Sequence, residues 1–341
     1  MATYRGRLAP SPTGYLHLGH ARTFWVAWQR ARAAHGKLIF RNEDLDYQRC
    51  RPEFVRAMFE DLRWLGLDWD EGPDASFETG NGGQTGDADL GGTVRNVVSR
   101  GGNVSHGGAD RGNFGPYSQS ERRSFYFAAW RKLRDSGLIY PCTCSRKDLE
   151  RALSAPHEEP RNSCGTAALG GVPATDDELP YPGTCHEKIG TARDYDSPTG
   201  VSWRFKVPDG ETISFDDGYF GRQEFVAGRD FADFLLWRRD DIPAYQLAVV
   251  VDDAAMQITE VVRGADLLKS TARQLLLIRA LGYPVPAYFH CPLLHDEKNV
   301  RLAKRHDALS LRALRAQSAD PEVLRKKFAA EVDWSRGSVK S

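Results

Sequence analysis

Apolar positions near the start of the chain follow two different periods. Short apolar runs at Arg5–Leu8 and Leu38–Glu43 predict strands. Between them, apolar side chains recur at helical spacing, at Ala21, Phe24, Trp25, Trp28 and Ala31. A strand, a helix and a strand in this order predict a parallel sheet, so we expect an α/β domain.

The later pattern predicts further elements of both kinds. Helices are expected at Pro52–Leu65, Phe125–Ser136, Asp266–Leu281, Ala308–Ala316 and Pro321–Val332. Strands are expected at Val201–Val207, Thr212–Phe215, Ile242–Val251 and Gln257–Val262. No internal repeat is visible in this order of elements.

Two stretches lack any such period. Residues 76–114 are mostly Gly, Asn, Asp, Ser and Thr, so we expect a solvated, disordered insertion there. Residues 154–180 are irregular and contain Pro156 and Pro160. Neither stretch is expected to add to a packed core.

Composition narrows the class of protein. The chain has 341 residues, enough for one large domain or two small ones. Lys+Arg and Asp+Glu both number 46, which excludes nucleic-acid binding by overall charge, so any RNA contact needs local basic patches. Such patches occur at Arg238-Arg239, Lys298–Arg305 and Arg325–Lys327. No apolar run reaches 18 residues, and neither a signal peptide nor a disulfide framework of the six cysteines is apparent. We therefore expect a cytoplasmic protein with no membrane partner.

The most informative stretch lies between the first strand and the first helix. It reads Arg7-Leu-Ala-Pro-Ser-Pro-Thr-Gly-Tyr-Leu-His17-Leu-Gly19-His20. The start of a helix offers unpaired N–H groups to a phosphate, and two imidazoles there can donate hydrogen bonds to it. Gly19 would let a ligand approach the backbone. Taken alone, this short motif is more often a corner with two solvated histidines.

Further motifs follow in a fixed order along the chain. They are Arg41-Asn-Glu43-Asp44-Leu-Asp46, Tyr117–Arg122, Tyr140-Pro-Cys142-Thr-Cys144, Ala244–Asp253, Glu260–Asp266 and a basic loop around Lys304. With the histidine motif, they make the chain resemble class I aminoacyl-tRNA synthetases of the glutamyl type over most of residues 5–310.

The resemblance implies a fold and its domains. It implies a Rossmann-like parallel sheet with an inserted small zinc-binding subdomain, and no anticodon-binding domain, because about 37 residues follow Lys304. The expected parts are the first half of a nucleotide-binding catalytic domain (1–141), a zinc-binding insertion (142–185), the second catalytic half (186–290), and the lysine-loop segment with C-terminal helices (291–341).

The resemblance also implies a glutamate pocket. The matching positions are Arg7, Ala9, Ser11, Glu43, Tyr245 and Arg263. Guanidinium groups bind carboxylates through two parallel hydrogen bonds, and Glu43 would pair with the substrate ammonium. Val249, four positions after Tyr245, replaces the polar residue that the family tends to carry. Singly, Glu43 could instead be a surface ion-pair residue and Tyr245 a core tyrosine.

Catalysis is implied for three residues. His17 and His20 match the groups that act on the α-phosphate of ATP, Gly19 lies between them, and Lys304 matches the second lysine of the family's mobile loop. Arg301 replaces the first lysine with its charge retained. The glutamate carboxylate would attack the α-phosphate in line, forming glutamyl-adenylate, and Mg²⁺ would arrive with ATP.

The spacing Cys142-Thr-Cys144 is typical of a metal or redox site, and the resemblance implies one structural Zn²⁺ per chain. The resemblance implies Cys142, Cys144, Tyr181 and Cys185 as ligands. Because residues 145–180 form a longer loop than usual, Cys164 and His186 stay open as alternative ligands. The alternative interpretation is a group of reduced, buried cysteines.

The glutamyl signature without an anticodon domain implies a particular reaction. A truncated branch of the family activates glutamate without RNA and esterifies queuosine in the anticodon loop of aspartate tRNA, so the expected partners are ATP, glutamate and the anticodon stem-loop of tRNA(Asp). We expect a monomer. The alternatives are a minimal enzyme that charges the 3′ end of glutamate tRNA, and an inactive paralogue that binds RNA or protein.

Overall fold

The computed structural model describes residues 3–73, 110–145, 147–149, 181–294 and 310–337. Most of the predicted insertion at 76–114, the predicted loop at 154–180, and the residues Cys164, Arg301 and Lys304 lie outside these ranges. Within them, no helix is both long enough and apolar enough to span a lipid bilayer.

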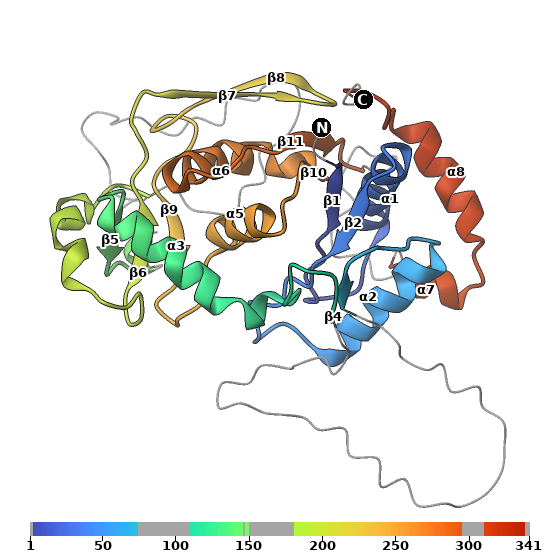
Figure 1. Cartoon of the computed structure of the whole chain (residues 1–341), viewed down its shortest axis with the longest axis horizontal. Helices are drawn as coiled ribbons and strands as arrows, with labels where there is room; N and C mark the ends of the chain where they lie inside the picture. The colour runs from blue at the N-terminus through green and yellow to red at the C-terminus, as the bar shows by residue number, and fades with distance from the viewer. Residues whose placement is uncertain (1–2, 74–109, 146, 150–180, 295–309, 338–341) are drawn as a thin grey trace, which may run out of the picture.

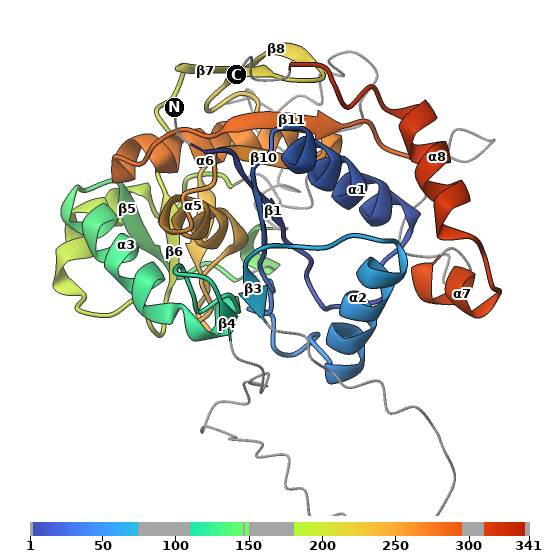
Figure 2. The ribbon, with the colours of Figure 1, turned by 45° about the vertical axis from the view of Figure 1, so that its right-hand side comes forward.

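A parallel sheet forms the centre of the molecule. Strand β1 (Arg5–Leu8) pairs in parallel with β2 (Lys37–Phe40), and α1 (Leu18–Ala33) connects them. Strand β10 (Glu260–Gly264) pairs in parallel with β11 (Ala287–Cys291). Figures 1 and 2 show β1 beside β10, where the amide of Thr259 donates to the carbonyl of Arg5 at 2.9 Å. The predicted β-α-β unit and α/β class are confirmed.

Helix α6 (Leu268–Leu281) crosses from β10 to β11 after a short 3-10 turn, η3 (Ala265–Leu267). It ends at Gly282, whose φ of 67° is the left-handed conformation that glycine adopts freely. The predicted helix at 266–281 is thereby confirmed, and the strand predicted at 257–262 lies two to three residues further on.

An antiparallel hairpin extends this sheet. Strands β7 (Thr212–Asp217) and β8 (Gly221–Val226) pair along their whole length, and Asp217 is the residue of β7 that pairs with Tyr288 of β11. In Figure 1 the hairpin runs along the top of the molecule. The end of β7 is therefore fixed beside β11.

A second, antiparallel sheet lies apart from the first. It consists of β5 (Ile139–Cys142), β6 (Ser202–Phe205) and β9 (Phe234–Trp237), in that order. Helix α3 (Arg123–Asp135) packs on it, with the Trp130 and Trp203 ring centres 5.0 Å apart. Figure 2 shows this group on the side of the molecule opposite α1 and α2 (Pro52–Trp64).

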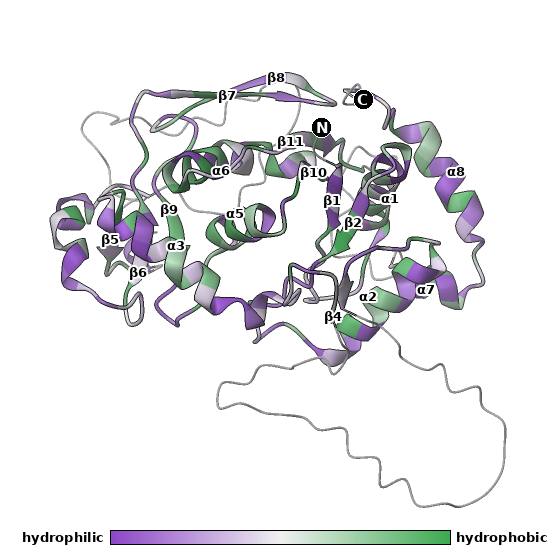
Figure 3. Cartoon of the chain, viewed as in Figure 1, coloured by the Kyte–Doolittle hydropathy of each residue, from purple (hydrophilic) through white to green (hydrophobic). Residues whose placement is uncertain are grey.

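The strand predicted at Ile242–Val251 is wrong, because this segment forms helix α5 (Tyr245–Ala255). Residues 246–253 of the helix are all buried, so burial extends around the whole helix, and Figure 3 colours much of α5 as hydrophobic. A helix buried on all sides has no amphipathic period, and its valines resemble a strand. Only its packing against α3, α6 and β9 distinguishes the two.

The remaining elements complete the molecule. They are β3 (Gly72–Pro73) paired with β4 (Asp110–Arg111), the 3-10 turns η1 (Gln119–Glu121) and η2 (His186–Asp194), and the helices α7 (Leu311–Ala316) and α8 (Pro321–Glu331). Helix α8 packs against α1 through Phe328 and Trp25, whose ring centres are 6.2 Å apart. The sequence analysis did not predict the short strands β5, β8, β9 and β11.

Candidate active site

The two histidines of the first motif face each other at the start of α1. His17 is the N-cap residue, and its Nδ1 accepts a hydrogen bond from the amide of Gly19 at 3.2 Å. Because Nδ1 accepts, the proton of the neutral ring lies on Nε2, which can donate. The His17 and His20 rings stack with their centres 3.8 Å apart. The structure therefore joins both histidines at an N-terminus suited to an anion.

Glycine is needed at position 19 because the His17 ring packs against it, and not only to let a ligand approach. A β-carbon at this position would lie 3.1 Å from Cε1 and 3.2 Å from Nδ1 of His17. These contacts are tighter than ordinary packing, so a larger residue would displace the ring. This reason could not be predicted from the sequence.

The chain returns to the first histidine after the predicted lysine loop. Ser310 forms an antiparallel bridge with His17, and the amide of Leu311 donates to the carbonyl of Leu16 at 2.7 Å. Lys304 itself lies outside the described residues, six positions before Ser310. The described end of this segment is therefore attached beside the histidine motif.

A buried cluster of charges lies at the carboxyl ends of β1 and β2. Arg41 is completely buried and donates to Glu43 at 3.0 Å and to Asp253 at 2.6 Å. Burial raises the pKa of Glu43, although Arg41 and Arg7 act in the opposite direction. Burial also acts to raise the pKa of Asp253, but Arg41 and Arg7 outweigh it and hold this pKa below its ordinary value. Arg41 and Asp253 are thus site residues that the sequence analysis did not assign.

Arg7 and Arg263 are brought to the same place by neighbouring strands. Arg7 donates to the carbonyl of Val262 at 2.9 Å, and its Nε lies 3.4 Å from Asp253. Arg263 follows Val262 on β10 and is also buried. Two guanidinium groups near the acids Glu43 and Asp253 give the site charges of both signs.

Tyr245 lies near these charges. The residue is 38 % exposed, yet the pKa of its hydroxyl is raised by burial, with Arg263, Glu43 and Arg7 also acting on it. Because α5 is a helix, Val249 and Asp253 follow Tyr245 on the same face, one and two turns later.

The loop that carries Ala9 and Ser11 lies along the same edge. The carbonyl of Pro10 accepts from the amide of Glu43 at 3.0 Å, and that of Leu8 accepts from the amide of Arg41 at 2.8 Å. Ser11 is exposed. The structure therefore brings Arg7, Ala9, Ser11, Glu43, Tyr245 and Arg263 to one region.

Asp252 joins the motifs into one network. Its carboxylate accepts from Arg122 Nε at 2.6 Å, Gln119 Nε2 at 2.8 Å and the Tyr126 hydroxyl at 2.9 Å. Asp252 and Arg122 are both completely buried. Because Asp252 adjoins Asp253, this network holds the start of α3 and the end of α5 beside the charge cluster.

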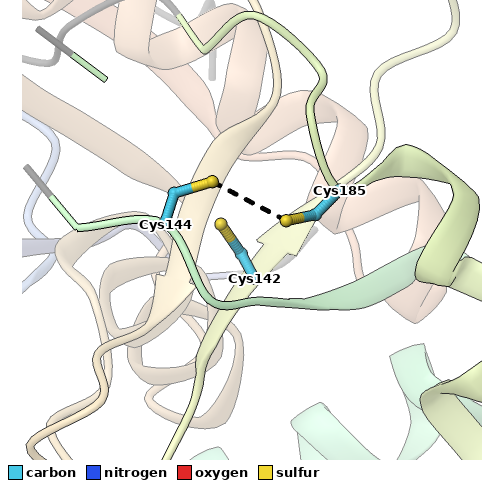
Figure 4. A group of neighbouring side chains, drawn as sticks. All are labelled: Cys142, Cys144 and Cys185. Carbon is cyan, nitrogen blue, oxygen red and sulfur yellow. Dashed lines mark hydrogen bonds between the residues drawn. The ribbon is translucent and has the colours of Figure 1, made fainter. Parts of the chain in front are cut away.

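Three cysteines form a separate cluster, shown in Figure 4. The sulfur atoms of Cys142, Cys144 and Cys185 all lie within 4.8 Å of one another, with those of Cys144 and Cys185 at 3.7 Å. The Tyr181 hydroxyl lies 3.5 Å from the sulfur of Cys142 and 3.8 Å from that of Cys144. All four predicted zinc ligands are therefore neighbours.

The geometry of this cluster fits a tetrahedral ion. Sulfur ligands at about 2.3 Å and an oxygen ligand at about 2.0 Å from one Zn²⁺ stand about 3.5 to 3.8 Å from one another. Hydrogen bonds from Tyr181, the Thr143 backbone and Cys144 overcome desolvation and lower the pKa of Cys185 to about 6, which favours the thiolate. The alternative ligand His186 instead contacts Asp233 through Nε2.

Comparison with known proteins shows which family the chain resembles. A family model described as tRNA synthetases class I (E and Q), catalytic domain, matches residues 3–336. A protein of Symbiobacterium thermophilum named glutamyl-Q tRNA(Asp) synthetase is 44 % identical over 94 % of this chain and 83 % of its own. One of the same name from Nitratidesulfovibrio vulgaris is also 44 % identical, over 91 % of this chain and 81 % of its own.

Longer relatives match over a smaller share of their length. Glutamate–tRNA ligase 2 of Acidithiobacillus ferrooxidans is 39 % identical over 95 % of this chain but 57 % of its own. A crystal structure of the glutamate-tRNA synthetase from Elizabethkingia anophelis superposes with a TM-score of 0.63 at 27 % identity, covering 89 % of this chain and 53 % of that chain.

Proposed function

The chain belongs to the class I tRNA synthetases of the glutamate and glutamine type, and on this premise we propose that it activates glutamate with ATP and transfers it to queuosine in tRNA(Asp). It is a ligase-type enzyme with an α/β catalytic domain. We choose tRNA(Asp) as the RNA substrate because the chain is 44 % identical to two proteins named glutamyl-Q tRNA(Asp) synthetase. Each of them is matched over more than four fifths of its length.

The charge cluster supplies a pocket for glutamate. Arg7 and Arg263 bind the carboxylates, for which guanidinium geometry is suited. Glu43 pairs with the ammonium, and Arg41 holds one of its oxygens at 3.0 Å. Ala9, Ser11 and Tyr245 complete the lining. Glutamine would leave an arginine underpaired, so such a site selects against it.

The histidine motif binds ATP and acts on the α-phosphate. The substrate carboxylate attacks the α-phosphorus, a P–O bond to glutamate forms, and the bond to the pyrophosphate oxygen breaks. His17 and His20, beside Gly19, donate to the phosphoryl oxygens, and Lys304 stabilises the departing pyrophosphate. These groups contribute position and charge, which is what phosphoryl transfer requires. Mg²⁺ binds with the phosphates of ATP.

The glutamyl-adenylate, a mixed anhydride, then transfers its glutamyl group to RNA. A hydroxyl of the cyclopentenediol of queuosine attacks the activated carbonyl carbon, an ester forms, the hydroxyl proton is released to solvent, and AMP leaves with the electrons of the broken bond. The anticodon stem-loop of tRNA(Asp) therefore has to reach the exposed rim of the glutamate pocket.

One Zn²⁺ held by Cys142, Cys144, Tyr181 and Cys185 has a structural role in this proposal. The donor set is closed, with no position left for a substrate. It would join the end of β5 to residues 181–185, which are separated from β5 by about 40 positions.

The test is transfer of radiolabelled glutamate to tRNA(Asp) prepared with and without queuosine. Label on the queuosine form alone, retained after removal of the 3′ adenosine, supports the proposal. Label at the 3′ adenosine of glutamate tRNA would instead show a minimal glutamate–tRNA ligase, the second candidate, which the 39 % identity to such a ligase favours. Absence of glutamate-dependent ATP–pyrophosphate exchange would indicate an inactive paralogue.

A further inference from the structure

Arg263 is held in place by three hydrogen bonds that it donates to buried side chains. Its Nε donates to Nε2 of His290 at 3.1 Å, its Nη1 to Gln274 at 2.8 Å, and its Nη2 to Thr271 at 2.7 Å. The three acceptor residues are at most 1 % exposed. A guanidinium has five N–H groups, so two remain for a substrate carboxylate once these bonds are made.

His290 connects Arg263 to a carboxylate at the end of β7. Nδ1 of His290 lies 2.6 Å from Oδ2 of Asp217, which also accepts from the backbone amide of His290 at 3.1 Å. The other oxygen of Asp217 accepts from the amides of Tyr219 at 3.0 Å and Phe220 at 2.9 Å. Because the Asp217 and His290 side chains are completely buried, this arrangement is rigid.

Nδ1 of His290 faces the Asp217 carboxylate, whereas Nε2 faces two groups, Nε of Arg263 at 3.1 Å and the Thr271 hydroxyl at 3.0 Å. A carboxylate accepts, so Nδ1 carries the proton toward Asp217, while the N–H of Arg263 donates, so Nε2 presents its lone pair. Burial lowers the pKa of His290 to about 4, although the bond to Asp217 acts to raise it. The ring is therefore neutral near pH 7, and its lone pair is available to Arg263.

We propose that Asp217 and His290 are positioning residues for substrate selection, in which Asp217 fixes the tautomer of His290 and His290 fixes the rotation of the Arg263 guanidinium. The inference rests on the proposed role of Arg263 in glutamate binding. It makes the affinity for glutamate depend on the β7–β8 hairpin, which has no part in the site described above. A carboxylate that served only to hold the hairpin turn would not have this effect.

The Asp217→Asn variant separates the role of Asp217 in positioning His290 from its role in holding the hairpin turn. The carbonyl oxygen of the asparagine still accepts from the amides of Tyr219 and Phe220, but its NH₂ group then faces Nδ1 of His290. The ring must protonate at Nε2 instead, so Nε2 can no longer accept from Nε of Arg263, and its N–H turns to the Thr271 hydroxyl 3.0 Å away.

We expect the KM for glutamate in ATP–pyrophosphate exchange to rise about 10- to 100-fold, as for loss of a hydrogen bond to a charged group. The KM for ATP should change little, whereas the unfolding temperature should fall, because the asparagine NH₂ group also faces the backbone amide of His290, which donates to Oδ2 in the unsubstituted protein. Asp216→Asn is the matched control, because it makes the same change one residue earlier at a side chain that is 79 % exposed. Unchanged KM values in Asp217→Asn, or equal losses for ATP and glutamate, would overturn the positioning roles.

A second pair of variants tests His290 as the hydrogen-bond acceptor for Arg263. His290→Gln retains a carbonyl oxygen that can accept from Arg263, whereas His290→Leu removes the acceptor at similar volume. We expect the KM for glutamate to rise much less in the first than in the second. Equal increases would overturn the inference.

The tautomer can be measured without any loss of fold. Nitrogen-15 NMR of the unsubstituted protein, with the His290 signal assigned from His290→Gln, should show protonation at Nδ1 near pH 7. An Nε2-protonated or charged ring would overturn the inference even if Asp217→Asn does not fold. If the unsubstituted protein shows no glutamate-dependent exchange, the proposed function fails, whereas normal glutamate affinity in Asp217→Asn refutes only the positioning roles.

Discussion

Nη1 of Arg41 lies 2.6 Å from Oδ1 of Asp253, and the Arg41 side chain is completely buried. The two residues come from the end of β2 and the end of α5, and Arg41 also holds Glu43. A buried cation between two carboxylates stabilises a site mainly because its removal leaves the acids uncompensated.

Substitution of Arg41 should therefore destabilise the protein. We expect Arg41→Met to lower the free energy of unfolding at pH 7 by about 3 to 5 kcal/mol, since Glu43 and Asp253 would remain buried without their partner. Urea unfolding measures the loss. Arg123→Met is the control, because Arg123 forms an exposed ion pair with Asp241. Equal losses in the two variants would show that the Arg41 cluster is not a stabilising element.

Asp61 gives the stability a pH dependence of known sign. Burial raises its pKa to about 6, with Arg315 at 3.4 Å acting to lower it and Glu60 to raise it. The native state therefore binds a proton that the unfolded state releases near pH 4, so stability falls as pH rises from about 4 to 6 and stays lower above that.

We expect Asp61→Asn to raise the free energy of unfolding by about 1 to 2 kcal/mol at pH 8, after allowance for solvent screening, and by little at pH 4. Chemical unfolding at the two pH values measures the difference. Glu53→Gln, at an exposed position in the first turn of the same helix, is the control. A gain of the same size at both pH values would contradict the titration.

His17 can be tested without loss of the helix cap. Asparagine is a strong N-cap residue, so His17→Asn preserves the start of α1 while it removes the imidazole. We expect kcat for glutamate-dependent ATP–pyrophosphate exchange to fall about 100- to 1000-fold, as for loss of a donor to a charged transition state. His35→Asn, at an exposed position beyond the end of α1, should leave the rate unchanged. Retained activity in His17→Asn would exclude His17 from catalysis.

The cysteine cluster makes a prediction about metal content. Mass spectrometry under native conditions should find one Zn²⁺ per chain, and Cys144→Ser should lose it together with part of the thermal stability, because a structural site contributes to folding. Cys50 lies outside the cluster, so Cys50→Ser should retain the metal. A protein of full stability and no zinc would support the alternative of reduced, buried cysteines.

We expect that a short link can replace residues 74–109, because the strands on either side of them, β3 and β4, pair with each other. Gly72 pairs with Arg111 and Pro73 with Asp110 in β3 and β4. We expect a short Gly/Ser link between these strands to preserve ATP–pyrophosphate exchange with glutamate, since closing a shorter loop costs less entropy. The full chain assayed in parallel is the control. Loss of exchange in a folded variant would assign a catalytic role to this segment.

The sequence by itself determined the elements whose signals are local. The alternation of apolar periods predicted β1, α1 and β2, because each period is set within one element. The histidine motif, the charged motifs and the cysteine spacing likewise identified residues that the structure brings together, and they carried the family resemblance.

Tertiary structure alone decided which distant residues became partners. Helix α5 is buried on every face, so its run of valines could not be distinguished locally from a buried strand. The bonds from Arg122 to Asp252, from Asp217 to His290 and from Arg263 to His290 join positions 130, 73 and 27 residues apart. Such contacts depend on how whole elements pack. The residue pattern of one segment therefore does not identify the side chains that contact it from other segments.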